Sequence, residues 1–150
     1  MRLTAHSDYA LRVLMYLALA PGRKATVREI ADSFHISQNH LAKVAQRLVR
    51  TGMVTSSVGR SGGLQLVAEP HEITLGAIVR AAEDDLAIVE CLGHTRYCRL
   101  AGVCGARGVF ADALDAFMAT LDAQTLETAL RNRDGVRGAL ALNALPRDPD

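Results

Sequence analysis

Three cysteines within 14 residues are the part of this sequence with the clearest chemistry. Cys91, Cys98 and Cys104 follow the pattern Cys-x6-Cys-x5-Cys, and the 150-residue chain has no other cysteine. An odd number of thiols cannot all pair within one chain. The spacing differs from the close CxxC pairs of zinc ribbons and from the ferredoxin pattern. Three thiolates on one loop can instead hold three irons of an iron–sulfur cluster and leave the fourth corner to another ligand.

Polar neighbours keep two other chemistries open for this loop. His94 lies between the first two cysteines, so a zinc site of Cys91, His94, Cys98 and Cys104 is an equal alternative on spacing alone. A redox-active set of thiols is the third possibility. Arg96 and Arg99 flank the cysteines and would offset the negative charge of a thiolate-bound cluster.

The two parts of the chain, residues 1–60 and residues 61–150, have net charges of opposite sign. Residues 1–60 hold nine Lys or Arg and three acids, whereas residues 61–150 hold eight Arg and thirteen acids. The net charge of +1 is therefore the near-cancellation of +6 and −5. A basic half joined to an acidic half indicates that only the N-terminal part meets a polyanion.

Residues 26–51 have the pattern of a helix-turn-helix. A first helix capped by Ser7 is expected to run through Ala20. Thr26 and Glu29 form a capping-box sequence that opens a short second helix. After a turn at residues 35–36, Ser37 is expected to cap a third helix whose buried positions are Leu41, Val44, Ala45 and Leu48. The exposed positions of this third helix are Gln38, Asn39, His40, Lys43, Gln46, Arg47 and Arg50. Because amides read base edges and cations hold phosphate or guanine, we expect DNA contacts from Ser37, Gln38, Asn39, His40, Lys43 and Arg47.

Residues 53–67 read as strand, glycine-rich tip and strand, which is a β-hairpin. After a helix-turn-helix such a hairpin is a wing. Arg60 at its tip suits a narrow minor groove. Thr74 is expected to cap a helix over residues 75–83, which completes a winged helix-turn-helix domain over residues 1–83.

Residues 84–104 form the cysteine loop, and residues 105–121 then have the pattern of a long helix within a region that extends to residue 131. The apolar stripe of this helix comprises Val109, Phe110, Ala113, Leu114, Phe117, Met118 and Leu121. One continuous stripe suits either a homodimer interface or packing within the monomer. The Gly-, Pro- and Asp-containing segment 132–150 is expected to be a flexible tail.

The fold class is therefore mainly α with a small β-hairpin: a winged helix-turn-helix domain plus a long dimerisation helix. The sequence shows no membrane-spanning run and no export signal, so a cytoplasmic protein is expected. It shows no Ser/His/Asp set, no paired catalytic carboxylates and no nucleotide-binding loop, so no enzyme is expected.

Several motifs in order make the chain resemble the iron–sulfur winged-helix transcriptional regulators over roughly residues 1–130. The matching stretches are Met1-Arg2-Leu3-Thr4, Asp8-Tyr9-Ala10-Leu11-Arg12, Ile36-Ser37-Gln38-Asn39-His40-Leu41-Ala42-Lys43-Val44, Gly59-Arg60-Ser61-Gly62-Gly63-Leu64, Ile73-Thr74-Leu75-Gly76, Glu83-Asp84-Asp85 and the three cysteines. The resemblance implies a homodimeric repressor on a palindromic operator in double-stranded DNA, with Cys91, Cys98 and Cys104 as cluster ligands.

Within that family the chain is similar to the nitric-oxide-sensing branch. The runs Asn39-His40-Leu41-x-Lys43 and Glu83-Asp84-Asp85 resemble that branch, and Arg107 stands where the cluster-homeostasis branch usually has His. The resemblance implies that Asp8 of the partner subunit is the fourth ligand, of a 4Fe–4S cluster in preference to a 2Fe–2S cluster, and that nitric oxide is the signal. The alternatives are an iron- or redox-responsive regulator of the same family and a winged-helix repressor with structural zinc.

Overall fold

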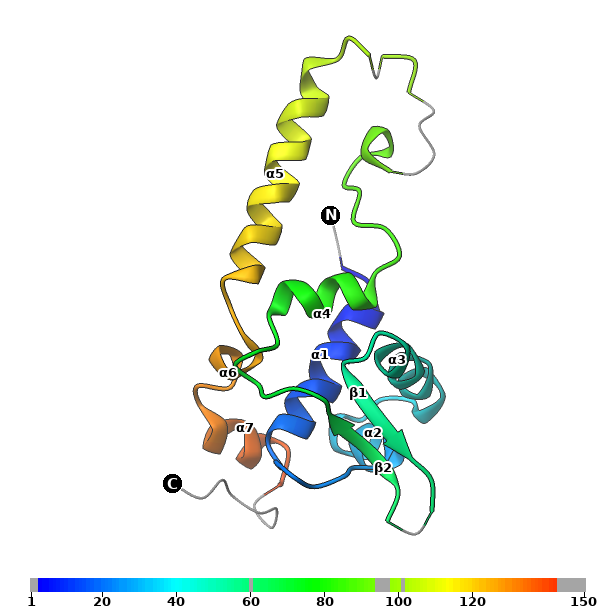
Figure 1. Ribbon diagram of the computed structural model, residues 1–150, viewed down its shortest axis with the longest axis vertical. Coiled ribbons are helices and arrows are strands. Elements are labelled where there is room, and N and C mark those ends of the chain that lie inside the picture. The colour runs from blue at the N-terminus through cyan, green and yellow to red at the C-terminus, as the bar shows by residue number, and fades with distance from the viewer. Residues whose placement is uncertain (1–2, 60, 94–97, 101, 143–150) are drawn as a thin grey trace.

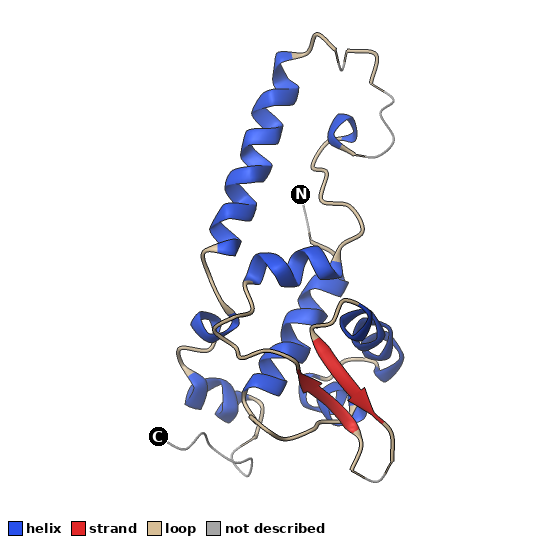
Figure 2. Cartoon of the chain, in the orientation of Figure 1, coloured by secondary structure: helices blue, strands red, loops and turns tan. Residues whose placement is uncertain are grey.

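The computed structural model describes residues 3–59, 61–93, 98–100 and 102–142. A helical body surrounds α1, and α5 and the segment before it extend from that body as an arm (Figure 1). In chain order the elements are α1 (Ala5–Ala18), α2 (Val27–Phe34), α3 (Gln38–Arg50), β1 (Val54–Ser57), β2 (Gly63–Leu66), α4 (Leu75–Ala82), the 3-10 turn η1 (Glu90–Leu92), α5 (Gly105–Asp122), α6 (Leu126–Ala129) and α7 (Arg133–Ala139). Figure 2 shows that the described residues are mainly helical, with the β1–β2 hairpin as their sheet. The predicted fold class is confirmed.

The first helix begins three residues before the predicted cap. Thr4 is the N-cap of α1, and its hydroxyl accepts a hydrogen bond from the amide of His6. Ser7 is instead buried inside the helix and donates its hydroxyl to Glu83. Both residue types cap helices well, and Glu83 accepts a hydrogen bond from the hydroxyl of each of them.

The helix-turn-helix follows its predicted pattern closely. The hydroxyl of Thr26 accepts from the amide of Glu29 and so caps α2. The Glu29 carboxylate, however, accepts from the buried Tyr16 hydroxyl (2.7 Å) and ion-pairs with Arg23 (2.6 Å), so only half of the capping box forms. His35 ends α2 in the left-handed conformation. The buried residues of α3 are the four predicted ones.

The wing is a short antiparallel hairpin in which Val54 faces Leu66 and Ser57 faces Gly63. Its second strand is tied to the loop before α2 by two backbone hydrogen bonds between Ala25 and Leu64 (2.7 and 3.0 Å). Gly63 has φ +155°, and a Cβ there would lie 2.8 Å from the Ala25 carbonyl oxygen. This close approach explains why glycine begins β2.

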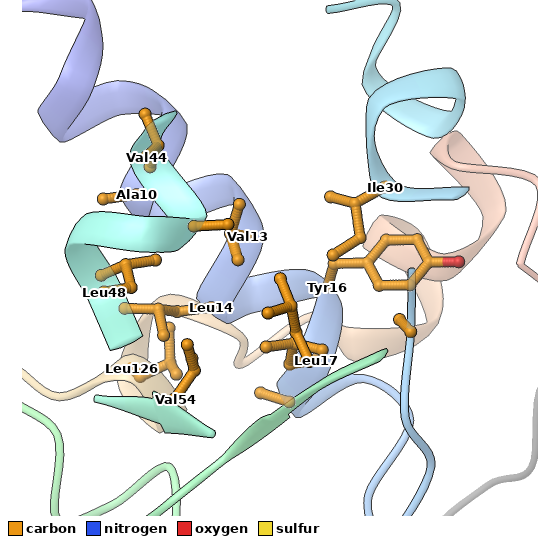
Figure 3. Packing of buried hydrophobic residues seen from close by; sticks show 14 of the residues in the cluster. Ala10, Val13, Leu14, Tyr16, Leu17, Ile30, Val44, Leu48, Val54 and Leu126 are labelled. Atoms are coloured by element: carbon orange, nitrogen blue, oxygen red, sulfur yellow. The ribbon is translucent and has the colours of Figure 1, made fainter. Parts of the chain in front are cut away.

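The core is centred on α1 and draws on both ends of the chain. Figure 3 shows Leu14 of α1 beside Leu48 of α3, Val54 of β1 and Leu126 of α6. Leu126 and Leu130 are at most 1% exposed. Burying such side chains contributes roughly 1.5–3 kcal/mol each. Side chains beyond residue 83 therefore belong to the same core cluster as the winged-helix elements, while the predicted division of the chain at residue 83 stays a prediction.

Part of the segment predicted to be a flexible tail, residues 133–142, is packed against α1. This segment forms α7, whose Arg133 donates to the Ala18 carbonyl (2.7 Å) and whose Arg137 donates to the Leu19 carbonyl (2.5 Å). Leu142 is buried behind it. The late carbonyls of a helix lack donors within the helix, and cations are favourable there. The C-terminal helix thus caps α1.

Candidate nucleic-acid interface and cysteine loop

The N-terminal end of α3 is an exposed polar surface. Ser37, Gln38, Asn39, His40 and Lys43 are all exposed, as the sequence predicts. Ser37 is the N-cap residue but makes no side-chain capping hydrogen bond. The first-turn amides of a helix attract anions. This surface can therefore approach a phosphate backbone while its amide side chains reach base edges.

Arg47 is the exception on the same helix. Its side chain is only 18% exposed, and its Nη1 pairs with Asp84 Oδ1 at 2.8 Å. Its Nε donates to the Ala81 carbonyl at 2.5 Å. The predicted exposure of Arg47 is corrected, because its guanidinium is held by the Ala81 carbonyl near the end of α4 and by Asp84 just beyond α4.

The tip of the wing presents Val58, which is fully exposed, and Gly59, which has φ +110°. Arg60 lies outside the described residues, so its minor-groove contact stays a prediction. The antiparallel strands place the tip at the far end of the hairpin from α4 (Figure 1).

The cysteine loop begins and ends side by side on the arm. Cys91 lies in η1, Cys104 is the N-cap residue of α5, and Arg107 in the first turn of α5 donates from Nε to the Cys91 carbonyl (3.3 Å). All three thiols are free, with Cys98 exposed and the other two partly buried. His94 of the alternative zinc site and the flanking Arg96 lie outside the described residues.

The described part of the chain contains no group of three His, Cys, Asp or Glu side chains arranged to hold a metal ion. The structure therefore does not gather the three predicted thiol ligands into one set. Their chemistry nonetheless fits an iron–sulfur cluster, because they are three free thiols on one loop. Cys104 is also the N-cap residue of the 18-residue helix α5.

Asp8 is exposed on α1 and forms a bidentate pair with Arg12 (Nη2–Oδ2 2.8 Å, Nε–Oδ1 3.2 Å). It does not join the cysteines of its own chain in any such donor group of the described residues. Beside it lies a hollow of about 250 Å³. The apolar side chains lining this hollow come from α1, α4, α5 and the N-terminal segment: Leu3, Leu11, Leu75, Ile78, Val79 and Leu121.

The apolar stripe of α5 divides into two parts. Val109 is 67% exposed and Phe110 42%, and Ala113 is exposed as well. Leu114, Phe117 and Leu121 are half-buried. Met118 is buried within the monomer, which fits the alternative of packing within one chain, and its role in a dimer interface stays a prediction. None of the helices in the described ranges is long and apolar enough to cross a membrane.

Glu83 is a site that the sequence pattern does not reveal. Its Oε1 accepts from the Thr4 amide (2.8 Å), the Thr4 hydroxyl (2.9 Å) and the Ser7 hydroxyl (2.5 Å). Partial burial alone would raise the pKa of Glu83. The three hydrogen bonds stabilise the charged carboxylate and together outweigh the effect of burial, so the pKa lies below its usual value. In the sequence Glu83 stands out only as part of an acidic run. Its hydrogen-bond partners lie 76 to 79 residues away, so no local spacing indicates that it binds them.

Comparison with known proteins places this geometry among transcriptional regulators. Residues 3–132 match the Rrf2 family, described as iron-dependent transcriptional regulators. The protein named HTH-type transcriptional regulator NsrR in Halalkalibacterium halodurans is 42% identical over 144 residues, covering 95% of this chain and 99% of that protein. The Bacillus subtilis protein of the same name is 40% identical over 144 residues, with the same coverage of 95% and 99%.

Solved structures share the same fold. CymR, the global cysteine regulator of B. subtilis, is similar with a TM-score of 0.69 and 28% identity, covering 86% of this chain and 95% of its own. IscR of T. potens has a TM-score of 0.72 at 22% identity and covers 91% of both chains. At that identity the likeness to IscR concerns the fold alone.

Proposed function

The chain belongs to the Rrf2 family of transcriptional regulators, and from that premise we propose that it is a homodimeric, nitric-oxide-sensitive repressor that senses through an iron–sulfur cluster. It is a DNA-binding regulator and not an enzyme. The observation that carries the proposal is the set of three free thiols on the arm of a chain about 40% identical to regulators named NsrR. The nitric-oxide specificity rests on the resemblance of residues 39–43 and 83–85 to that branch.

DNA is held by the N-terminal end of α3 and by the wing. Ser37, Gln38, Asn39, His40 and Lys43 supply contacts in the major groove, and Arg60 supplies one in the minor groove. In a two-fold dimer the two α3 helices read half-sites about 34–36 Å apart, which requires a palindromic operator.

Cys91, Cys98 and Cys104 would hold a 4Fe–4S cluster, with Asp8 of the partner subunit as the fourth ligand. When bound, the cluster supplies iron that reacts with nitric oxide, and a carboxylate is a weaker partner for that iron than a thiolate. Asp8 must leave its ion pair with Arg12 in order to bind elsewhere. Because Asp8 lies one turn beyond Thr4, which Glu83 holds, its release bears directly on the contact between α1 and α4.

A second copy of the chain covers the exposed part of the α5 stripe. Val109, Phe110 and Ala113 are the side chains offered to it, with Leu114, Phe117 and Leu121 at its edge. The hollow beside Asp8 is apolar and open, so it can accept an apolar side chain from α5 of the partner subunit. This arrangement places Asp8 near the partner's arm.

The test uses anaerobically purified protein and a duplex of about 30 base pairs, long enough for two half-sites, selected by the wild type from a random pool. We expect the wild type to lose at least tenfold in affinity on exposure to nitric oxide, whereas Cys98→Ala binds weakly before and after. The loss of affinity on exposure to nitric oxide should differ from that of the wild type in Asp8→Ala. It should match that of the wild type in Asp32→Ala, which removes an exposed acid from the same N-terminal half of the chain.

Retained binding and retained release by Cys98→Ala would contradict the sensing role. Release by chelator or oxygen but not by nitric oxide would instead identify an iron- or redox-responsive regulator.

A further inference from the structure

One arginine links α3 to the segment that leads into the cysteine loop. Arg47 lies in the last turn of α3. It reaches across to α4, where Nε donates to the Ala81 carbonyl (2.5 Å) and Nη1 pairs with Asp84 (2.8 Å). The two partners are 34 and 37 residues away in sequence. Arg47 therefore makes a tertiary contact between two elements, not a local one along its helix.

The Arg47 side chain is packed as well as bonded. It is 18% exposed, against 90% for Asp84. It lines a small hollow together with residues of α1, α3 and α4, namely His6, Ala10, Val44, Leu48, Ala81 and Ala82. The exposed ion pair is screened by water and contributes little by itself. The hydrogen bond to Ala81 is sheltered and uses a carbonyl near the C-terminal end of α4, which has no donor within the helix.

The segment gripped by Arg47, residues 81–84, also contacts the other elements that matter for sensing; we call it the junction. Glu83 within the junction holds Thr4 and Ser7 at the start of α1, the helix that carries Asp8. Asp84 opens the segment that leads to Cys91 (Figure 1). The junction thus contacts α1 through Glu83 and α3 through Arg47.

We infer that Arg47 is a positioning residue that holds α3 in its DNA-binding orientation by gripping the junction, and that it is not a DNA contact. The inference rests on the proposed function in taking operator binding as its readout. To reach a phosphate, the guanidinium would have to abandon the Ala81 carbonyl and Asp84 together. A movement of the junction, in contrast, passes directly to α3 through the two bonds.

Replacement by lysine separates the two roles. Lysine keeps the positive charge but lacks the planar fork that serves Ala81 and Asp84 at once. A positioning role predicts that Arg47→Lys and Arg47→Gln both lose about tenfold in affinity, the scale of one charge-assisted hydrogen bond. A phosphate contact predicts that Arg47→Lys binds nearly as the wild type does.

Salt dependence gives a second and independent readout. Loss of a phosphate contact lowers the slope of log affinity against log salt by about 1. We expect the slope to be unchanged in Arg47→Gln. Arg50→Gln and Arg50→Lys are the matched controls, because Arg50 is an exposed arginine in the same last turn of α3.

Removal of the Asp84 carboxylate changes DNA affinity in opposite directions under the positioning role and the DNA-contact role of Arg47. If Asp84 merely restrained a DNA-contacting arginine, Asp84→Ala would raise affinity by releasing Arg47 and removing a negative charge. The positioning role predicts lower affinity, with Arg47→Gln/Asp84→Ala no weaker than Arg47→Gln alone. Because Asp84 is 90% exposed, this variant leaves the fold intact, and thermal unfolding of all variants checks that it does.

The measurements use the same selected duplex and cluster-loaded protein as above. Near-wild-type binding by Arg47→Lys, or a gain in affinity in Asp84→Ala, overturns the inference whatever nitric oxide does. A wild type that keeps its DNA after nitric oxide contradicts the proposed function, while the affinity and salt tests of Arg47 keep their meaning.

Discussion

Replacing Arg137 by methionine tests whether the C-terminal helix caps α1. Arg137 is 4% exposed, and its Nη1 donates to the Leu19 carbonyl at 2.5 Å. Leu19 is itself fully buried. Methionine keeps most of the apolar stem but removes the guanidinium, so the donor to the Leu19 carbonyl is lost while much of the packing is retained.

The expected cost follows from leaving a buried acceptor without this donor. A hydrogen bond from a charged group contributes about 1.5–3 kcal/mol, and removing one partner in a buried site incurs the full desolvation penalty of the other. At ~2–4 °C per kcal/mol for a chain of this length, Arg137→Met should lower Tm by roughly 3–12 °C. The gain from no longer burying a charge acts in the opposite direction, so we expect a shift in the lower half of this range.

The assay is thermal and urea unfolding at one fixed protein concentration, since dimerisation makes Tm depend on concentration. Arg131→Met, which replaces an exposed arginine just before α7, is the matched control and should shift Tm by less than about 2 °C. An Arg137→Met protein as stable as Arg131→Met would refute the idea that α7 caps α1. It would return residues 133–142 to the status of a dispensable tail.

Two further substitutions test the contacts of α4. The pKa of Glu83 is lowered in the fold, so the stability it contributes is present above its unfolded pKa and is lost as pH falls through the folded one. Urea unfolding between about pH 5 and pH 3 should therefore show a steep loss in the wild type and a flatter one in Glu83→Gln; identical slopes would refute this. A Cβ at Gly76 would collide with Oδ1 of Asp122, whose two carboxylate oxygens each accept a 2.6 Å hydrogen bond from Arg80. Gly76→Ala should thus lower Tm, whereas Gly108→Ala, in open space within α5, should stabilise by about 0.5–1 kcal/mol, and equal shifts would contradict the geometry.

Local patterns in the sequence were enough to predict the helix-turn-helix. The four buried residues of α3 recur at helical spacing, and Thr26 and His35 bound α2 as expected. The hairpin followed from its glycine-rich tip and flanking strands. These features depend on neighbours within a few residues, which the sequence displays directly.

Features that depend on distant partners could not be predicted in this way. Thr4 and Ser7 are both residue types that cap helices, and their hydrogen bonds to the distant Glu83 leave no local signal in the sequence. Arg47 has the spacing of an exposed residue, but Ala81 and Asp84 turn its guanidinium inward. The packing of α7 could not be predicted for the same reason, because its arginines donate to backbone carbonyls more than 100 residues earlier in the chain.

The candidate cluster site was predicted by residue type more than by geometry. Three cysteines on one loop indicate their chemistry, and the structure adds that Cys91 and Cys104 stand at adjoining ends of that loop through Arg107. The fourth ligand could not follow from the residues alone, because Asp8 belongs to another element and, under the proposal, to another subunit.

The most direct test of the central claim is an anaerobic absorption spectrum with iron and sulfide counts, recorded with DNA affinity before and after nitric oxide. We expect coloured protein with about four irons and four sulfides per chain. Nitric oxide should change the spectrum and release the selected duplex in the same experiment. Colourless protein holding stoichiometric zinc, or a spectral change without loss of DNA, would contradict it.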